Sequence, residues 1–223
     1  MSIESAILKL TWILFILLIA GCAEKGPDGL TICCAGDSLM RPIPRHLRKL
    51  MPVDGANVDI KDWARGGLSS QTYMSFYRKR VQRQKRYSVD FILFQLGTND
   101  VRHLFTQKYS LTQFDANLKI IIDEFRKFPL KRDNSIKILI ASIPPLYAPE
   151  YQEMNSFIQN KLNPVLKKLS ETEALIFVDN WKVLKDRLHL YRPDGIHPNS
   201  QGEWVLAQNW IIAMRRAVRS SIP

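Results

Sequence analysis

The chain has 223 residues, of which 46% are hydrophobic and 24% are charged. This balance excludes a disordered tail, which would be less apolar, and a multispanning membrane protein, which would be less charged. A chain of about this length buries roughly 70% of the surface it exposes when unfolded, so a single core needs no disulfide or metal staples. Lysine and arginine outnumber aspartate and glutamate by 32 to 21, and the net charge of +11 favours anionic partners such as lipid headgroups, polysaccharides or nucleic acid.

An apolar run covers residues 10–20 near the amino terminus. It falls short of the ~20 residues that a membrane-spanning helix needs, but it suits the core of a signal peptide. The run ends in Ile19-Ala20-Gly21-Cys22, which resembles the lipobox of a bacterial lipoprotein. The resemblance implies cleavage before Cys22 and lipidation of its thiol.

We therefore expect a lipoprotein signal peptide over 1–21 and a short tether over 22–29, with an uncleaved membrane anchor as the alternative. Either arrangement places the domain in the bacterial cell envelope, on the periplasmic side and bound to a membrane. The residue after the cysteine is Ala23 and not an aspartate, which resembles the sorting signal of lipoproteins that go to the outer membrane.

Beyond the tether, short apolar runs rich in β-forming residues alternate with longer segments of helical period, which is typical of an α/β domain with a mostly parallel sheet. In the final segment apolar side chains recur every four residues from Leu206 to Val218, and Ser200 and Glu203 have the spacing of a capping box. No repeat or linker interrupts the pattern, so we expect one domain over 30–220. Strands are predicted at 30–35, 58–63, 89–96, 136–142 and 175–178, and helices at 44–51, 71–86, 113–127, 153–169 and 201–219.

Cys33 and Cys34 are neighbours in the first predicted strand. Neighbouring side chains of an extended segment point to opposite faces, so a bond between the two sulfurs would be strained and we expect two buried thiols. A redox or metal pair would need a spacer such as Cys-x-x-Cys. Since no cluster of histidines and cysteines has the spacing of a metal site, the sequence predicts no metal and no cofactor.

Four polar motifs follow predicted strands. Ligands of an open parallel sheet bind beyond the carboxyl ends of its strands, so these positions are where chemistry is expected. The motifs are Gly36-Asp37-Ser38-Leu39, Ala64-Arg65-Gly66-Gly67-Leu68-Ser69-Ser70, Gly97-Thr98-Asn99-Asp100 and, before the last helix, Asp194-Gly195-Ile196-His197-Pro198.

Together and in this order, the motifs resemble the signature blocks of the SGNH (GDSL-type) hydrolase superfamily and span almost the whole domain. One four-residue match would arise by chance in roughly one such chain in a hundred, whereas four ordered matches are far more specific. The resemblance implies a flavodoxin-like three-layer α/β/α sandwich with five strands. It also implies an oxyanion hole formed by the backbone N–H groups of Ser38 and Gly67 and the side-chain amide of Asn99. Gly66 is the alternative to Gly67, because Asp62 stands where the family often has an asparagine.

The chemistry of these residue types agrees with that reading. A serine hydroxyl is a poor nucleophile until a base removes its proton, and histidine suits that task near neutral pH, so Ser38 and His197 form the predicted pair. Asp194 can accept the Nδ1 proton of His197 and leave Nε2 free for Ser38. Asp100 is expected to be a structural partner and not a second base.

We therefore predict a serine esterase that cleaves an acyl or acetyl ester of a lipid or a glycan through an acyl-enzyme on Ser38. An O-acyltransferase that delivers the acyl group to a glycan hydroxyl would use the same residues. A non-catalytic binding module is the third possibility. We expect a monomer, and no nucleic acid partner because no reader module is visible.

Two further features bear on partners and substrates. Arg78-Lys79-Arg80, Arg83 and Lys85-Arg86 place six cations in nine residues of a predicted helix, which is either a solvated face or a docking surface for anionic headgroups or an acidic glycan. Segments 102–112 and 144–151 follow strand ends and are predicted to be substrate-selecting loops.

Overall fold

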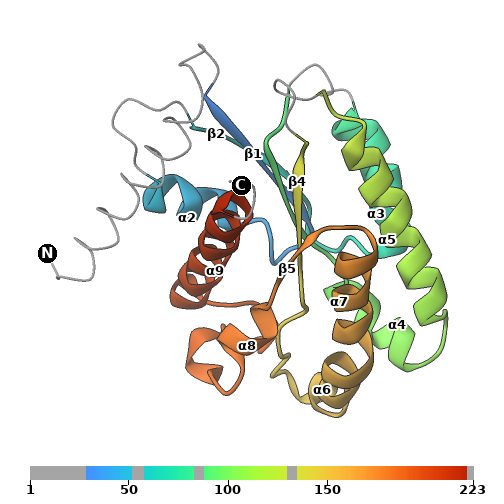
Figure 1. The fold of residues 1–223 in the computed structure, drawn as a ribbon. Helices are drawn as coiled ribbons and strands as arrows, with labels where there is room; N and C mark the ends of the chain where they lie inside the picture. Colours follow the sequence, from blue (N-terminus) through green and yellow to red (C-terminus); the bar gives the residue numbers. More distant parts are fainter. Residues whose placement is uncertain (1–28, 52–57, 83–87, 130–134, 220–223) are drawn as a thin grey trace, which may run out of the picture.

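The computed structural model describes residues 29–51, 58–82, 88–129 and 135–219. The predicted signal peptide, Cys22 and nearly all of the predicted tether lie outside these residues. The described strands form one fully parallel sheet in the order β2-β1-β3-β4-β5, so the predicted five-stranded sheet is confirmed (Figure 1). The strands are β1 (Leu30–Gly36), β2 (Val58–Ala64), β3 (Phe91–Gln95), β4 (Lys137–Ala141) and β5 (Ile176–Val178).

Helices cover both faces of the sheet and complete the predicted three-layer sandwich (Figure 1). One face carries α2 (Ile43–Leu50), α8 (Asn180–Leu184) and α9 (Ser200–Arg219). The other face carries α3 (Ser70–Arg80), α5 (Leu111–Arg126) and α7 (Asn163–Thr172), with the short helices α4 (Val101–Phe105) and α6 (Gln152–Phe157) beyond the carboxyl end of the sheet.

The burial of the strands explains their apolar sequences. The central strand β3 is buried along its whole length, as expected for a parallel strand covered on both faces, whereas the edge strand β2 alternates between buried and exposed residues. Cys33 packs into the core beneath α3 and α5, and Cys34 packs into the core beneath α2 and α9. Both thiols are free and buried, as predicted, and burial raises the pKa of each well above its usual value.

Three local predictions were wrong. The helix expected over 153–169 is interrupted by a π-type turn at Ile158–Leu162, next to Pro164, which has no N–H to donate to a carbonyl in the preceding turn. The helix expected over 71–86 ends at Arg80, and residues 83–87 lie outside the described part. The expected loop at 102–112 holds most of α4 and the start of α5.

The capping box predicted for α9 is also absent. The side chain of Asn199 caps this helix, because its Oδ1 accepts the N–H groups of Gln201 and Gly202 at 3.0 and 3.1 Å. The carboxylate of Glu203 is held by donors from other segments, so it does not reach back to the start of the helix.

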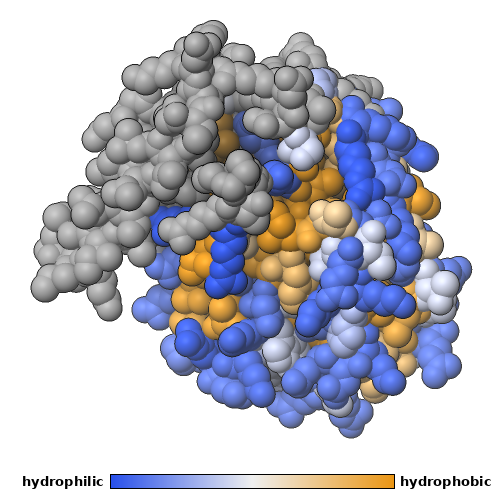
Figure 2. Space-filling model, in the orientation of Figure 1, coloured by the Kyte–Doolittle hydropathy of each residue, from blue (hydrophilic) through white to orange (hydrophobic). Residues whose placement is uncertain are grey.

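The surface matches this layering. In the view of Figure 2, hydrophilic side chains cover the outer faces of the helices, and apolar side chains show in the seam between α9 and α7, beside the edge strand β5. Ile176 and Phe177 of that strand are accordingly only half-buried. In the portion of the chain that the structure describes, no helix has both the length and the hydropathy that crossing a bilayer requires.

Candidate active site

The strand order places the candidate site at a switch point of the sheet. The chain leaves β1 toward one side and β3 toward the other, so a crevice opens beyond the carboxyl ends of these two neighbouring strands. Ser38 follows β1 and Asn99 follows β3. The segment that carries Asp194 and His197 reaches the same edge just before α9.

The turn before Ser38 depends on a glycine. Gly36 has φ +142°, and a β-carbon there would lie 1.8 Å from the carbonyl oxygen of Gln95, so only glycine allows β1 and β3 to approach this closely. The next residue, Asp37, is buried, and its two carboxyl oxygens accept the N–H groups of Leu39 at 3.0 Å and Thr98 at 3.3 Å. Burial raises the pKa of Asp37 to about 6, although these hydrogen bonds favour the ionised form.

The structure brings the predicted serine, histidine and aspartate into one hydrogen-bonded chain. Ser38 Oγ lies 2.9 Å from His197 Nε2, although 159 residues separate them, and His197 Nδ1 lies 2.9 Å from Asp194 Oδ2. The second carboxyl oxygen of Asp194 accepts the backbone N–H groups of Ile196 and His197, each at 2.8 Å. This geometry suits a His197 ring that donates from Nδ1 and accepts the Ser38 proton at Nε2.

The electrostatics favour an ionised Asp194. Burial opposes ionisation, but the hydrogen bonds from His197 and Ile196 outweigh it and hold the pKa of Asp194 below its usual value. The side chains of His197 and Asp194 are 33% and 44% exposed, so this end of the hydrogen-bonded chain opens to solvent. A substrate or a water molecule can therefore reach the imidazole.

The expected oxyanion donors lie on neighbouring loops. Asn99 is exposed and donates one Nδ2 hydrogen to the carbonyl of Leu68 at 2.9 Å, which leaves its second amide hydrogen for a ligand. Gly67 has φ +78°, a backbone conformation that favours glycine. A β-carbon on Gly66 would lie 3.7 Å from the β-carbon of Ser38, so the second motif packs directly against the serine. The choice of Gly67 over Gly66 as the N–H donor stays a prediction.

Asp100 is a structural partner, as predicted. It is fully buried, accepts the N–H of Ser70 at 3.0 Å and the Ser70 hydroxyl at 2.7 Å, and also accepts the hydroxyl of Tyr109. Burial raises the pKa of Asp100, and these hydrogen bonds partly offset that effect. The carboxyl group therefore fixes the start of α3, just after Gly66 and Gly67, against the motif that carries Asn99.

The predicted loop at 144–151 lies against the turn that carries His197. The carbonyl of Gly195 accepts the N–H groups of Tyr147 at 2.6 Å and Ala148 at 3.2 Å. Gly195 has φ +62°, and a β-carbon there would come within 2.4 Å of the Ala148 nitrogen. The loop is therefore placed where it can contact a substrate bound at Ser38.

Sequence reasoning missed Arg192. Its backbone N–H donates to the His197 carbonyl at 2.8 Å and its Nε donates to the Pro198 carbonyl at 3.1 Å, so it closes the turn between Asp194 and His197. No sequence pattern signals these contacts, because their acceptors are backbone carbonyls. Across residues 29–51, 58–82, 88–129 and 135–219, no three histidine, cysteine, aspartate or glutamate side chains gather as metal ligands would.

Comparison with known proteins assigns the family. The model of the GDSL-like lipase/acylhydrolase family matches residues 22–205. The chain belongs to this family. Its members hydrolyse ester bonds, so the superfamily and the enzyme class predicted from the four motifs, an ester-bond hydrolase of the SGNH type, are confirmed.

Similar proteins agree with the assignment. A multidomain esterase from Ruminococcus flavefaciens is 26% identical over 140 residues, which are 61% of this chain and 17% of that longer protein. An acetylxylan esterase from Geobacillus stearothermophilus superposes with a TM-score of 0.64 at 17% identity, over 84% of this chain and 94% of that one. An α/β hydrolase from the metagenome of Lake Arreo, Spain, gives a TM-score of 0.62 at 16% identity, over 83% and 95% of the two chains. These two likenesses confirm the fold.

Proposed function

We propose that this protein is a serine esterase that removes an acyl or acetyl group through an acyl-enzyme on Ser38. The observation that carries the proposal is the continuous contact from Ser38 Oγ through the His197 ring to Asp194, with both links at 2.9 Å. A nucleophile, a base and a group that orients the base are the parts this chemistry needs.

In the proposed first half-reaction, Ser38 Oγ attacks the ester carbonyl while His197 Nε2 takes the hydroxyl proton. Asp194 keeps the Nδ1 proton in place and stabilises the imidazolium that forms. The negative oxygen of the tetrahedral intermediate is bound by the N–H groups of Ser38 and Gly67 and by the free amide hydrogen of Asn99. When the carbon–oxygen bond of the ester breaks, the imidazolium gives its proton to the leaving alcohol.

In the second half-reaction, water attacks the acyl-enzyme, His197 takes a proton from it, and the acid leaves as Ser38 recovers its own proton. The side chain of His197 is 33% exposed, so water can reach the imidazole for this step. The predicted serine, histidine and aspartate meet within one chain, so the proposed reaction needs no residue of a second copy, and we propose that the protein acts as a monomer.

The direct test compares initial rates of hydrolysis of a chromogenic acetyl ester by the wild type and by Ser38→Ala. We expect the variant to lose at least about 10³-fold in kcat. Ser156→Ala, an exposed serine on α6, is the matched control and should hydrolyse at the wild-type rate. Equal rates for Ser38→Ala and the wild type would end the proposal.

The substrate class and the transferase alternative need separate assays. The family and the acetylxylan esterase among the similar structures support a carbohydrate acetyl ester. Acetylated xylan and a lysophospholipid should therefore be compared as substrates. We expect the release of acetate from the xylan to be faster than the release of fatty acid from the lysophospholipid. Product analysis with an added polysaccharide acceptor distinguishes hydrolysis, which yields free acetate only, from transfer, which yields a newly acetylated polymer.

We also propose that Cys22 carries a lipid that anchors the protein on the periplasmic side of the envelope, at the outer membrane. Seven residues separate Cys22 from Leu30, the first residue of β1. The seven residues of β1 span about 23 Å. They lead from the amino end of the sheet, where the tether is attached, to Ser38 beyond its carboxyl end. Phe91, the first residue of β3, is in register with Ile32 near the start of β1, so both strands begin at the same end of the sheet. A short tether therefore favours an orientation in which the candidate site points away from the anchoring membrane, toward a polymer.

Labelling cells with radioactive palmitate tests the anchor. We expect a labelled protein in the membrane fraction and, for Cys22→Ala, neither label nor membrane retention, because acyl chains contribute about 0.8 kcal/mol per buried methylene. Cys34→Ala is the control and should keep the label, since that thiol is buried in the core. A Cys22→Ala protein that still carries palmitate would contradict the proposal.

A further inference from the structure

A buried carboxylate lies behind the candidate site and is not used in the proposed chemistry. Glu203 is in the first turn of α9, and its residue is 1% exposed. Its two oxygens are held from two directions. Oε2 accepts from the Arg45 guanidinium and lies 3.0 Å from His46 Nε2, while Oε1 accepts from Arg192 Nη2 at 2.6 Å.

The three partners belong to the two segments that carry the reacting groups. Arg45 and His46 are on α2, the helix that follows Ser38. Arg192 belongs to the turn of Asp194 and His197, which it closes through its own N–H and its Nε. Glu203 therefore links the nucleophile's segment to the base's segment by direct ionic contacts.

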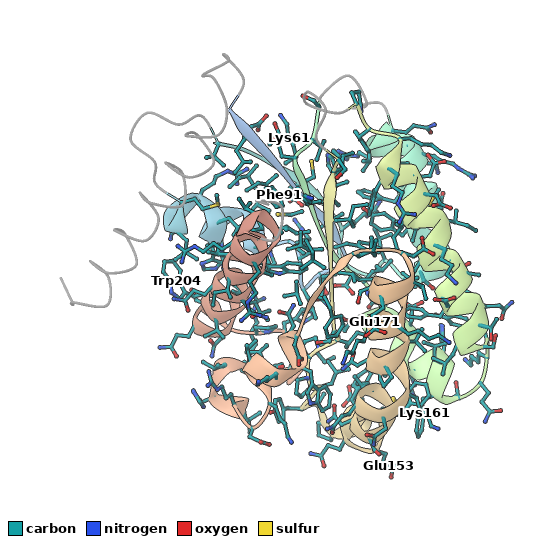
Figure 3. The ribbon with its side chains drawn as sticks, in the orientation of Figure 1. Lys61, Phe91, Glu153, Lys161, Glu171 and Trp204 are labelled. Carbon is teal, nitrogen blue, oxygen red and sulfur yellow. The ribbon has the colours of Figure 1, made fainter. Side chains whose placement is uncertain are left out.

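The environment of Glu203 keeps it charged. Burial alone would raise its pKa, but the hydrogen bonds from His46, Arg192 and Arg45 hold the pKa below its usual value. The neighbouring Trp204 projects from α9 toward α2, where its ring meets that of His46 edge-on at 5.9 Å (Figure 3). The link between α9 and α2 is thus fixed by packing as well as by charge.

We propose that Glu203 is a positioning residue, which acts through Arg192 to hold His197 at hydrogen-bonding distance from Ser38. Arg192 donates its backbone N–H to the His197 carbonyl and its Nε to the Pro198 carbonyl, while Glu203 Oε1 accepts from Nη2 of the same guanidinium. Without the carboxylate, the guanidinium is free to leave the Pro198 carbonyl, and the turn loses the support that sets the position of the imidazole. A displacement of about 1 Å in a reacting group can cost about 100-fold in rate.

The first test measures kcat and KM of Glu203→Gln with the chromogenic acetyl ester, with rates normalised to folded sites by burst titration. The variant preserves the shape of the side chain and removes its charge. We expect kcat to fall about 10- to 100-fold and KM to change less than about threefold, because the substrate does not touch Glu203. Arg192→Gln should give the same pattern and serves as the second variant if Glu203→Gln does not fold.

Arg45→Gln is the matched control. It removes another cation from the same carboxylate, but His46 still joins Glu203 to α2, and Arg45 makes no described contact with the His197 turn. We expect kcat within about twofold of the wild type. If Arg45→Gln lowers kcat as much as Arg192→Gln does, general loss of stability explains the effect and the proposal is wrong.

A double-mutant cycle with His197→Ala separates positioning from a merely structural role. If Glu203 acts through the imidazole, Glu203→Gln should not lower the residual activity of His197→Ala any further. A further loss of the same size in that background would overturn the proposal. The inference rests on the proposed function. If Ser38→Ala and His197→Ala keep full activity, that function fails, whereas if they are inactive and Glu203→Gln is unaffected, only this inference fails.

Discussion

Asp37 should make the stability of the protein depend on pH in a predictable direction. Its carboxyl group is fully buried next to Ser38, and burial raises its pKa from 3.8 to about 6. A folded-state pKa above the unfolded value means that folding favours the protonated form. The stabilisation is complete below about pH 3.8 and disappears as pH rises through about 6.

The size of the effect follows from the two titration curves. Between pH 8 and pH 5, protonation of Asp37 in the folded state should raise the free energy of unfolding by roughly 1 to 2 kcal/mol. At a urea m-value of about 2 kcal/mol/M, this is a shift of roughly 0.5 to 1 M in the unfolding midpoint. Asp37→Asn cannot titrate and should lose this part of the pH dependence, whatever its absolute stability.

The assay is urea unfolding of the wild type, Asp37→Asn and a control variant, followed by tryptophan fluorescence at pH 5 and pH 8. The control is Asp123→Asn, because the Asp123 side chain is 61% exposed and pairs only with its helical neighbour Arg126 among the described ion pairs. It should shift between the two pH values as the wild type does. If Asp37→Asn shifts by the same amount as the wild type, the buried carboxyl is not the group that titrates and the reasoning is refuted.

Three further substitutions test the site and its scaffold. Asp194→Asn should lower kcat about 10³- to 10⁴-fold with little change in KM, since the amide no longer holds the proton on His197 Nδ1, and steady-state ester hydrolysis measures this. Asn99→Ala should lower kcat about 10²- to 10³-fold in the same assay, and an unchanged kcat would exclude Asn99 as an oxyanion donor. Gly97→Ala should destabilise the fold by about 1 to 3 kcal/mol in urea unfolding, because Gly97 has φ +127° and a β-carbon would lie 2.8 Å from Ile143 Cδ1.

The fold and the arrangement of the four motifs were predictable because both depend on local patterns. Continuous apolar runs such as β3 signal strands buried on both faces, and parallel strands bring the residues that follow them to one edge. Ser38 and Asn99 follow from this rule. His197 follows β5 only after a long connection, so its arrival at Ser38 was expected from the family resemblance more than from spacing.

What the sequence did not predict depends on contacts between distant segments. Glu203 has the spacing of a capping residue, but donors from α2 and from the turn before α9 hold its carboxylate instead. Asn199, one residue before the helix, takes over the capping role. A local pattern ranks helix-capping residues by spacing alone, so it cannot show that Arg45 and Arg192, from other segments, hold the buried carboxylate of Glu203.

Pro164 is the opposite case, because a local signal for the break in the helix is present in the sequence. The helical period across 153–169 is continuous, but the missing N–H of Pro164 accompanies a π-type turn immediately before it. The interruption separates α6 from α7 at the carboxyl end of the sheet, where the loop at 144–151 meets the His197 turn.

The most direct measurement is the labelling of the folded protein with an alkyl fluorophosphonate, followed by mass spectrometry of its peptides. This reagent bonds to a serine oxygen whose proton a nearby base removes, so its rate reports the Ser38–His197 contact without any assumption about the natural ester. We predict one adduct per chain, on Ser38, and labelling at least about 10³-fold slower in His197→Ala. An adduct on a different serine, or an unchanged rate in His197→Ala, would contradict the account.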